Sequence, residues 1–192
     1  MICVPITSKT IEEAVKDIKE AEEVADIIEL RLDYLKNPDL KVLLETARKP
    51  VIVTCRKKSE GGLYEGDEKG RVEILLKAIE EGANYVDVEL STPEPLLDKL
   101  KKKKAETRLI LSYHNFKHVP DDLQNTYDRM LQKGCEIVKI AVMANSCEDN
   151  LRIFDIIEQA KSKNMDIIAF CMGEYGEISR VLSPLFGGYL TF

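Results

Sequence analysis

Long apolar runs are missing from this chain of 192 residues. No stretch approaches the roughly 20 apolar residues that a membrane-spanning helix needs, which argues against an integral membrane protein. The first ten residues, MICVPITSKT, also lack the basic region and the long apolar core of a signal peptide. We therefore expect a cytoplasmic protein with no membrane partner.

Paired cysteine motifs are absent as well. The chain has five cysteines, an odd number, and no two of them have the CxxC spacing of zinc and redox sites. They are Cys3, Cys55, Cys135, Cys147 and Cys171. Three of them lie in apolar, strand-like runs. This pattern predicts free thiols in a reducing compartment and no disulfide framework.

The sequence has no excess of positive charge, since its formal net charge is -6. A molecule of this charge is not expected to attract nucleic acid or an anionic membrane. The one basic cluster, residues 101–104, is interpreted as the solvated end of a helix.

No linker rich in proline or glycine divides the chain, and its length fits one domain over residues 1–192. Short strand-like runs alternate with charged segments whose apolar residues recur every three or four positions, as in helices. The expected strands cover residues 2–6, 27–32, 51–56, 85–90, 108–114, 136–142, 166–172 and 188–192.

Eight strands that alternate with helices predict a parallel sheet, and eight is the number that closes a (β/α)8 TIM barrel. A doubly wound open sheet usually has a glycine-rich turn after its first strand, and residues 7–10 contain no glycine. We therefore predict an α/β protein, a compact (β/α)8 barrel. The sequence shows no final helix after the last expected strand.

Alternation along each expected strand indicates which side chains point to the barrel axis. Large apolar residues at every second position are expected under the helices, which leaves charged residues on the inner face. The inner set comprises Glu29, Arg31, Arg56, Asp87, Glu89, His114 and Lys139. Most lie toward the carboxyl ends of their strands, where barrel enzymes carry their active sites. Buried charges are costly unless they are paired, so such a set favours a chemical role.

Lys139 is the strongest candidate of this set. It interrupts an apolar strand, residues 137–142, and its phase points it inward. Burial disfavours the charged ammonium form, and the neutral amine is the form that attacks a carbonyl to make an imine.

Structural interpretations compete with this chemical one. Asp87 is expected to pair with an arginine in a structural layer, and Glu29 with Arg31 is open to interpretation as a simple buried ion pair. His114 alone is open to interpretation as a core histidine with its hydrogen bonds satisfied. Glu60, in the loop after the third strand, is either solvated or reaches over the barrel mouth to orient a base such as His114.

Six segments together resemble the type I 3-dehydroquinate dehydratases, which form a Schiff base in the shikimate pathway. Each segment alone is weak, but the six occur in order and at family-like spacing through almost the whole chain. The segments are residues 28–33 (IELRLD), 53–62 (VTCRKKSEGG), 86–90 (VDVEL), 111–116 (LSYHNF), 138–142 (VKIAV) and 178–180 (ISR).

The resemblance implies roles for eight residues. Lys139 is expected to form the Schiff base with the C3 ketone of 3-dehydroquinate. His114 is expected to act as general base and then as general acid, oriented by Glu60. The remaining residues are expected to contact substrate, with Glu29 and Arg56 on its hydroxyls, Arg31 in the same polar network, Arg180 on its carboxylate and Met172 lining the pocket. The resemblance implies no metal and no organic cofactor, and it implies a homodimer.

One family feature has no counterpart in this sequence. After the eighth strand the family has a loop with a Ser-Ala-Pro-Gly-Gln-like stretch that touches substrate, followed by a final helix, whereas this sequence stops at Phe192. We expect weaker substrate binding and a more open site than is usual in the family, with the lysine–histidine chemistry retained.

Two other functions are compatible with the same residues. A class I aldolase would share the Schiff-base lysine, but it normally needs a phosphate site after its last strands. Gly187 and Gly188 lie at the start of the eighth expected strand and not after it, which argues against such a site. A non-catalytic barrel that binds a carboxylate ligand through Arg180 is the alternative from a different class.

Overall fold

A computed structural model describes all residues from 1 to 192. The chain forms two compact units. Residues 2–109 make up the first unit, and residues 110–192 together with Met1 make up the second. Each unit is built from repeats of a strand followed by a helix.

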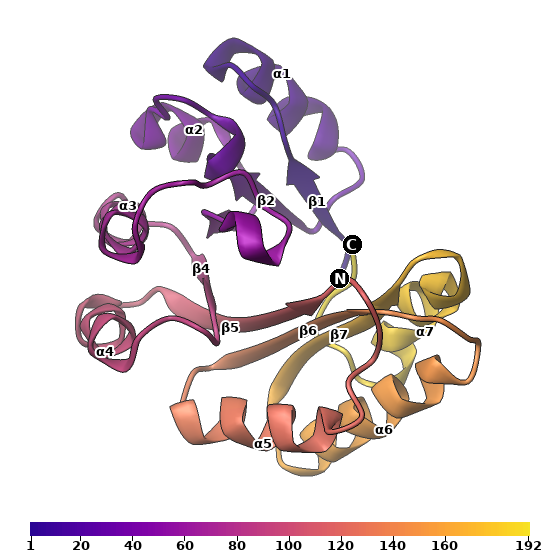
Figure 1. The fold of residues 1–192 in the computed structure, drawn as a ribbon. Helices are drawn as coiled ribbons and strands as arrows, with labels where there is room; N and C mark the ends of the chain where they lie inside the picture. Colours follow the sequence, from indigo (N-terminus) through magenta and orange to yellow (C-terminus); the bar gives the residue numbers. More distant parts are fainter. The chain divides into compact units, whose positions relative to one another are not determined.

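The first unit contains four parallel strands, which are hydrogen-bonded in chain order. These strands are β1 (Cys3–Ile6), β2 (Ile27–Arg31), β3 (Val51–Thr54) and β4 (Tyr85–Glu89). The helices that follow them are α1 (Ile11–Ala21), α2 (Leu40–Thr46), α3 (Glu68–Glu80) and α4 (Glu94–Lys103). Figure 1 shows these helices along one side of the strands.

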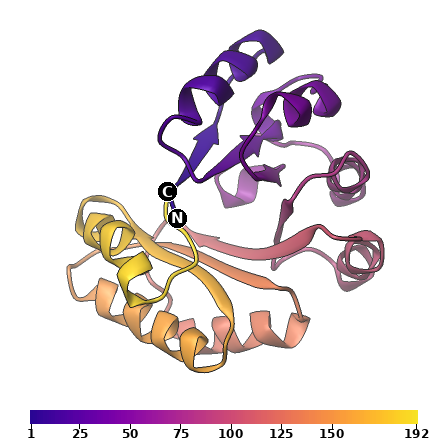
Figure 2. The same ribbon diagram turned by 180° about the vertical axis from the view of Figure 1, so that it is seen from behind.

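The second unit contains three parallel strands in chain order, the first of which starts with two residues of the first unit. They are β5 (Arg108–Asn115), β6 (Ile137–Met143) and β7 (Asp166–Met172). Their helices are α5 (Leu123–Lys133), α6 (Asp149–Ser162) and α7 (Glu177–Phe186). Helices α5 and α6 lie side by side along one face of these strands in both views (Figures 1 and 2).

The helices follow the apolar periodicity of the sequence. In α1 the buried residues are Ala14, Ile18 and Ala21, which recur every three or four positions. Thr10 begins this helix with a capping box, because its side chain accepts from the Glu13 backbone N–H and the Glu13 carboxylate accepts from the Thr10 N–H.

No helix of the protein is both long and apolar enough to cross a membrane.

The expected eighth strand over residues 188–192 does not form. Helix α7 ends at Gly187, whose φ of 114° is the left-handed conformation that glycine adopts readily. The Tyr189 N–H then donates to the Ile167 carbonyl (2.7 Å) and the Thr191 N–H to the Met1 carbonyl (2.9 Å). Because these two bonds go to different segments, no continuous ladder develops. Figure 2 shows the two chain ends beside each other at this contact.

Thiol labelling of the native protein tests the packing of both units. Four of the five free cysteines are buried, and only Cys147 is exposed. Burial raises the pKa of Cys55 and of Cys171 to about 12, so both thiols remain protonated and unreactive at pH 8. We expect iodoacetamide to label Cys147 alone, as read by peptide mass spectrometry.

The matched control is Cys147→Ser, which should take up no label until the protein is unfolded. Rapid labelling of Cys55 or Cys171 in native protein would show that the strands are not packed as described.

Candidate active site

Lys139 lies in the middle of strand β6 and is buried, with 4% of its surface exposed. It stands opposite Ser112 of the neighbouring strand β5. Side chains alternate along a strand, so His114, two residues beyond Ser112, lies on the same face of these strands as Lys139. The two residues that the sequence marked for proton and imine chemistry therefore come together on adjacent strands.

His114 is the last residue but one of β5 and is only half-buried. Its imidazole ring stacks at 6.4 Å, centroid to centroid, on the ring of Phe116. The histidine thus lies at the carboxyl end of the strand, where a base can reach a ligand.

Two phenyl rings connect Lys139 to Arg180. The Lys139 Nζ lies 4.3 Å from the centroid of the Phe192 ring, and the Arg180 guanidinium carbon lies 4.8 Å from the centroid of the Phe170 ring. The two rings are 5.8 Å apart. Arg180 belongs to helix α7, so its side chain reaches the Phe170 ring from a helix and not from a strand. Met172, the last residue of β7, is half-buried and stands opposite Met143.

Phe170 and Phe192 were not among the site residues expected from the sequence. Phe170 has the same phase along β7 as Met172, so strand alternation could have identified it. Alternation could not place Phe192, because the strand expected over residues 188–192 does not form.

Arg56 anchors the charged residues of the first unit. Its guanidinium is shared between two buried carboxylates, with Nη2 at 2.7 Å from Asp87 and Nη1 at 3.1 Å from Glu89. Burial lowers the pKa of Arg56, but these carboxylates outweigh burial and raise it above the ordinary arginine value. The prediction that Asp87 pairs with an arginine is confirmed, and Arg56 is charged at every accessible pH.

Glu29 and Arg31 lie at the carboxyl end of β2, as expected from the sequence. The buried Glu29 carboxylate accepts from the Thr54 hydroxyl at 2.7 Å. Arg31 forms a two-pronged ion pair with Asp33, with distances of 2.9 Å from Nε and 2.8 Å from Nη2. Burial lowers the pKa of Arg31, but Asp33 outweighs it, so the net shift is upward.

Asp33 connects several segments at the end of β2, although it was not among the site residues expected from the sequence. Its carboxylate is fully buried and accepts, besides the two Arg31 bonds, the backbone N–H groups of Arg56 (3.1 Å) and Leu63 (3.0 Å). It thereby fastens the segment after β3 to the end of β2. Its position directly after the E-L-R-L run was the available signal.

Glu60 closes a short 3-10 helix, Lys58–Glu60, in the loop between β3 and α3. Its carboxylate accepts from the Ser91 hydroxyl at 2.7 Å and lies 4.0 Å from the Lys57 ammonium. Burial raises the pKa of Glu60, partly opposed by the Ser91 hydrogen bond. The expected pairing of Glu60 with His114 stays a prediction.

The same loop is folded back on the strand end by a tight turn. The Tyr64 N–H donates to the Arg56 carbonyl at 3.1 Å. A Cβ on Gly62 would stand 2.0 Å from that carbonyl oxygen, so only glycine allows this approach. Gly62, the second glycine of the E-G-G sequence, is therefore needed for the turn that holds the Glu60 loop against Arg56.

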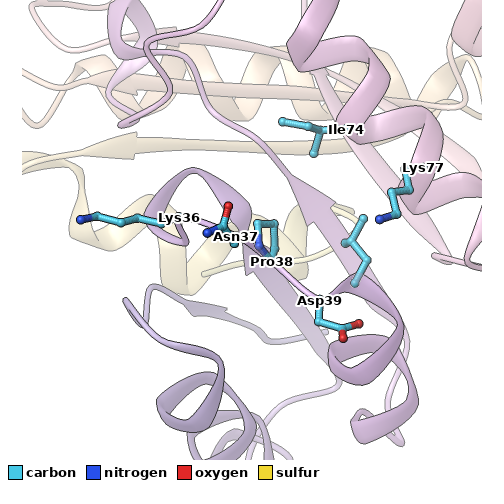
Figure 3. A pocket seen from close by; sticks show the side chains of 7 residues that line it. Lys36, Asn37, Pro38, Asp39, Ile74 and Lys77 are labelled. Carbon is cyan, nitrogen blue, oxygen red and sulfur yellow. The ribbon is translucent and has the colours of Figure 1, made fainter.

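A separate surface pocket of about 490 Å³ lies in the first unit, between the segment before α2 and helix α3 (Figure 3). Lys36, Asn37, Pro38, Asp39, Leu40, Ile74 and Lys77 line it. None of the residues expected to act on substrate is among them. The charged strand ends, and not this pocket, are therefore the candidate active site.

A parallel β/α protein with charged side chains buried at the carboxyl ends of its strands belongs to the class of β/α barrel enzymes. Comparison with known proteins identifies the family within that class. The model of the type I 3-dehydroquinase family matches residues 2–192. The chain belongs to this family.

Individual relatives agree with the family assignment. The 3-dehydroquinate dehydratase of Desulfotalea psychrophila is 41% identical over 172 residues, which cover 88% of this chain and 76% of that protein. The solved structure of the Geobacillus kaustophilus 3-dehydroquinate dehydratase is 26% identical, covering all of this chain and 80% of its own, with a TM-score of 0.92. That of the Clostridium difficile type I enzyme is 28% identical, covering all of this chain and 82% of its own, with a TM-score of 0.90. These likenesses confirm the predicted fold class and the family resemblance.

Replacing Asp33 tests the hub at the end of β2. In Asp33→Asn one carboxylate oxygen becomes an NH2 group that faces donors, so at least one buried N–H loses its acceptor. Leaving a buried polar group unsatisfied costs about 1–3 kcal/mol, and we expect the free energy of unfolding in urea to fall by about that amount.

The matched control is Asp128→Asn, at a surface carboxylate that accepts a single side-chain hydrogen bond from Gln124. It should change the unfolding free energy by less than about 0.5 kcal/mol. Equal stability of the two variants would contradict the role given to Asp33.

Proposed function

We propose that this protein is a 3-dehydroquinate dehydratase that converts 3-dehydroquinate to 3-dehydroshikimate in the shikimate pathway of aromatic amino acid biosynthesis. The observation that carries the proposal is Lys139, a buried lysine at the position where this family is expected to form its Schiff base. It lies on a strand next to the one that bears His114. The full-length match to the family model supports the same substrate.

The first step of the proposed mechanism is imine formation. The neutral Lys139 amine attacks the C3 ketone of 3-dehydroquinate, one proton is taken up from solvent, and a water molecule leaves as the protonated imine forms. The positive imine nitrogen then withdraws electrons from C2 and makes its proton acidic. The Clostridium difficile enzyme has been solved with covalently modified comenic acid, which supports covalent chemistry in the family.

His114 is proposed to carry the proton through the second step. As general base it takes the C2 proton, which leaves an enamine, and as general acid it returns a proton to the departing C1 hydroxyl, which leaves as water. Histidine suits both directions because its reference pKa of about 6.5 is close to neutral pH. Hydrolysis of the conjugated imine then releases the enone product and restores Lys139. Glu60 is proposed to orient His114 through a hydrogen bond.

Charged residues are proposed to hold the substrate in place. Arg180 would bind the carboxylate, since a guanidinium fork matches a carboxylate in shape and charge. Glu29 and Arg56 would hold hydroxyl groups, with Arg31 in the same polar network, and Met172 would line the pocket. Arg56 and Arg31 are each held by a carboxylate, which supports a fixed binding surface.

We also propose a cytoplasmic location, a homodimer, and a single catalytic domain over residues 1–192. The five free cysteines support a reducing compartment. The homodimer rests on the family resemblance, and sedimentation equilibrium would test it.

Borohydride trapping tests the Schiff base. The protein is incubated with 3-dehydroquinate, reduced with sodium borohydride and digested for mass spectrometry. We expect a stable substrate-derived adduct on Lys139, because reduction converts the imine to a secondary amine. In Lys139→Ala the adduct should disappear and kcat should fall at least about 10³-fold, as for removal of other covalent nucleophiles.

Lys163→Ala is a suitable control, because Lys163 lies on the solvent side at the end of α6 and should leave adduct and activity unchanged. Turnover by wild type without an adduct would overturn the Schiff base. Wild type that binds substrate and neither forms an adduct nor releases the enone would favour the non-catalytic alternative.

A further inference from the structure

Arg71 is a fully buried arginine on a helix that otherwise presents apolar residues to the strands. It belongs to the first turn of α3 and has no exposed surface. It is not among the residues proposed to contact substrate or to carry the chemistry. A buried guanidinium is costly unless its donors are satisfied, so its partners show what it is for.

The guanidinium of Arg71 bridges several partners at once. Its Nε and Nη2 donate to the Glu68 carboxylate at 3.0 and 2.7 Å, and Nη2 also donates to the Thr92 hydroxyl at 2.7 Å. Nη1 contacts the Glu89 carboxylate and the Cys55 carbonyl, the latter at 3.4 Å. Arg71 thus links the start of α3 to the ends of β3 and β4.

One arm of this arrangement leads to Arg56. One Glu89 oxygen contacts Arg71, and the other lies 3.1 Å from Arg56 Nη1 and accepts from the Lys57 backbone N–H at 3.3 Å. Glu89 is therefore clamped between two arginines. Its place, and with it the place of the Arg56 guanidinium, depends on Arg71.

The other arm leads to Glu60. The Glu68 oxygen that does not face Arg71 accepts from the Lys57 ammonium at 2.8 Å. The same ammonium lies 4.0 Å from the Glu60 carboxylate. Burial raises the pKa of Glu68, but the hydrogen bonds from Lys57 and Arg71 outweigh burial and lower it, so Glu68 stays ionised.

The charges of this cluster are close to balance. Arg56, Lys57 and Arg71 carry three positive charges, against four negative charges on Glu60, Glu68, Asp87 and Glu89. Without Arg71 two positive charges would face four carboxylates. The repulsion among the carboxylates would then move Glu89 and Glu68, and with them the Arg56 and Lys57 side chains that they hold.

We propose that Arg71 is a positioning residue for the dehydration, which fixes Arg56 through Glu89 and Glu60 through Glu68 and Lys57. The inference rests on the proposed function, in which Arg56 holds substrate and Glu60 orients His114. Arg71 itself touches no substrate. A purely structural arginine would instead affect stability alone.

Two variants test the two arms. Arg71→Lys keeps the charge but cannot make the forked contacts to Glu68, Thr92 and Glu89 together. Displacement of reacting groups by about 1 Å can cost on the order of 10²-fold in rate, so we expect kcat/KM for 3-dehydroquinate to fall by about that factor, with a higher KM and a lower kcat. Glu68→Gln interrupts only the Glu60 arm, and kcat should fall about tenfold while KM stays within about twofold.

Coupling and control measurements separate positioning from stability. Because both variants break one network, the double variant should lose less activity than the product of the two single losses. Glu73→Gln is the matched control on the same helix, where Glu73 pairs with Lys99 at the surface. It should leave kcat, KM and the unfolding temperature unchanged.

Each outcome decides between the alternatives. Wild-type kcat and KM in Arg71→Lys and Glu68→Gln, with only a lower unfolding temperature, would overturn the positioning role. If Arg71→Lys does not fold, Glu68→Gln decides alone, since its side chain is 30% exposed and tolerates the change. The wild-type protein is assayed before any variant. If it does not dehydrate 3-dehydroquinate, the proposed function is refuted, and the role of Arg71 is not what has failed.

Discussion

The buried ion cluster around Arg56 is the constraint on which the charged strand ends of the first unit depend. Arg56 is shared between Asp87 and Glu89, and all three side chains are at most 4% exposed. Taking charges out of water is unfavourable, and removal of one partner from a buried pair typically costs about 3–5 kcal/mol because the other charge is left uncompensated. Asp87 and Glu89 therefore depend on Arg56 for charge compensation. Replacement of the whole ion cluster by hydrophobic residues of equal volume would be neutral or favourable for stability in many proteins.

Lys139 is placed by a different principle. Strand alternation and burial put it on the face that it shares with His114, and the aromatic ring of Phe192 lies over its amine. Imine formation needs the neutral amine, and hydrolysis of the imine returns it. A buried lysine on the same strand face as a histidine is therefore suited to the proposed catalytic cycle.

Most of the fold and much of the site could be predicted from the sequence. The period of two along the strands identified Glu29, Arg56, Asp87 and Glu89 correctly as buried polar residues. The same period placed Lys139 and His114 on one face. These predictions succeed because alternation is imposed by backbone geometry and does not depend on distant contacts.

The failures have a common cause in long-range contacts. Residues 188–192 alternate like a strand, but a strand needs a neighbour along its length, and here Tyr189 and Thr191 bond to different segments. Arg71 follows Glu68 by three residues on a helix, which in sequence is the pattern of a solvated ion pair. Only the fold shows that Glu89 and Thr92 come to meet it from β4 and the residues after it.

Asp33 and Arg71 together hold the loop after β3 against the ends of the strands. Asp33 fixes the start of the loop through the Arg56 N–H and its middle through the Leu63 N–H. Arg71 fixes the opposite side through Glu68, which holds Lys57. Side chains that are already aligned need not be ordered when substrate binds. The loss of their conformational entropy therefore occurs during folding and not during catalysis. Fixed side chains at strand ends suit the proposed reaction, in which one histidine first accepts a proton from C2 and then gives it to the departing C1 hydroxyl.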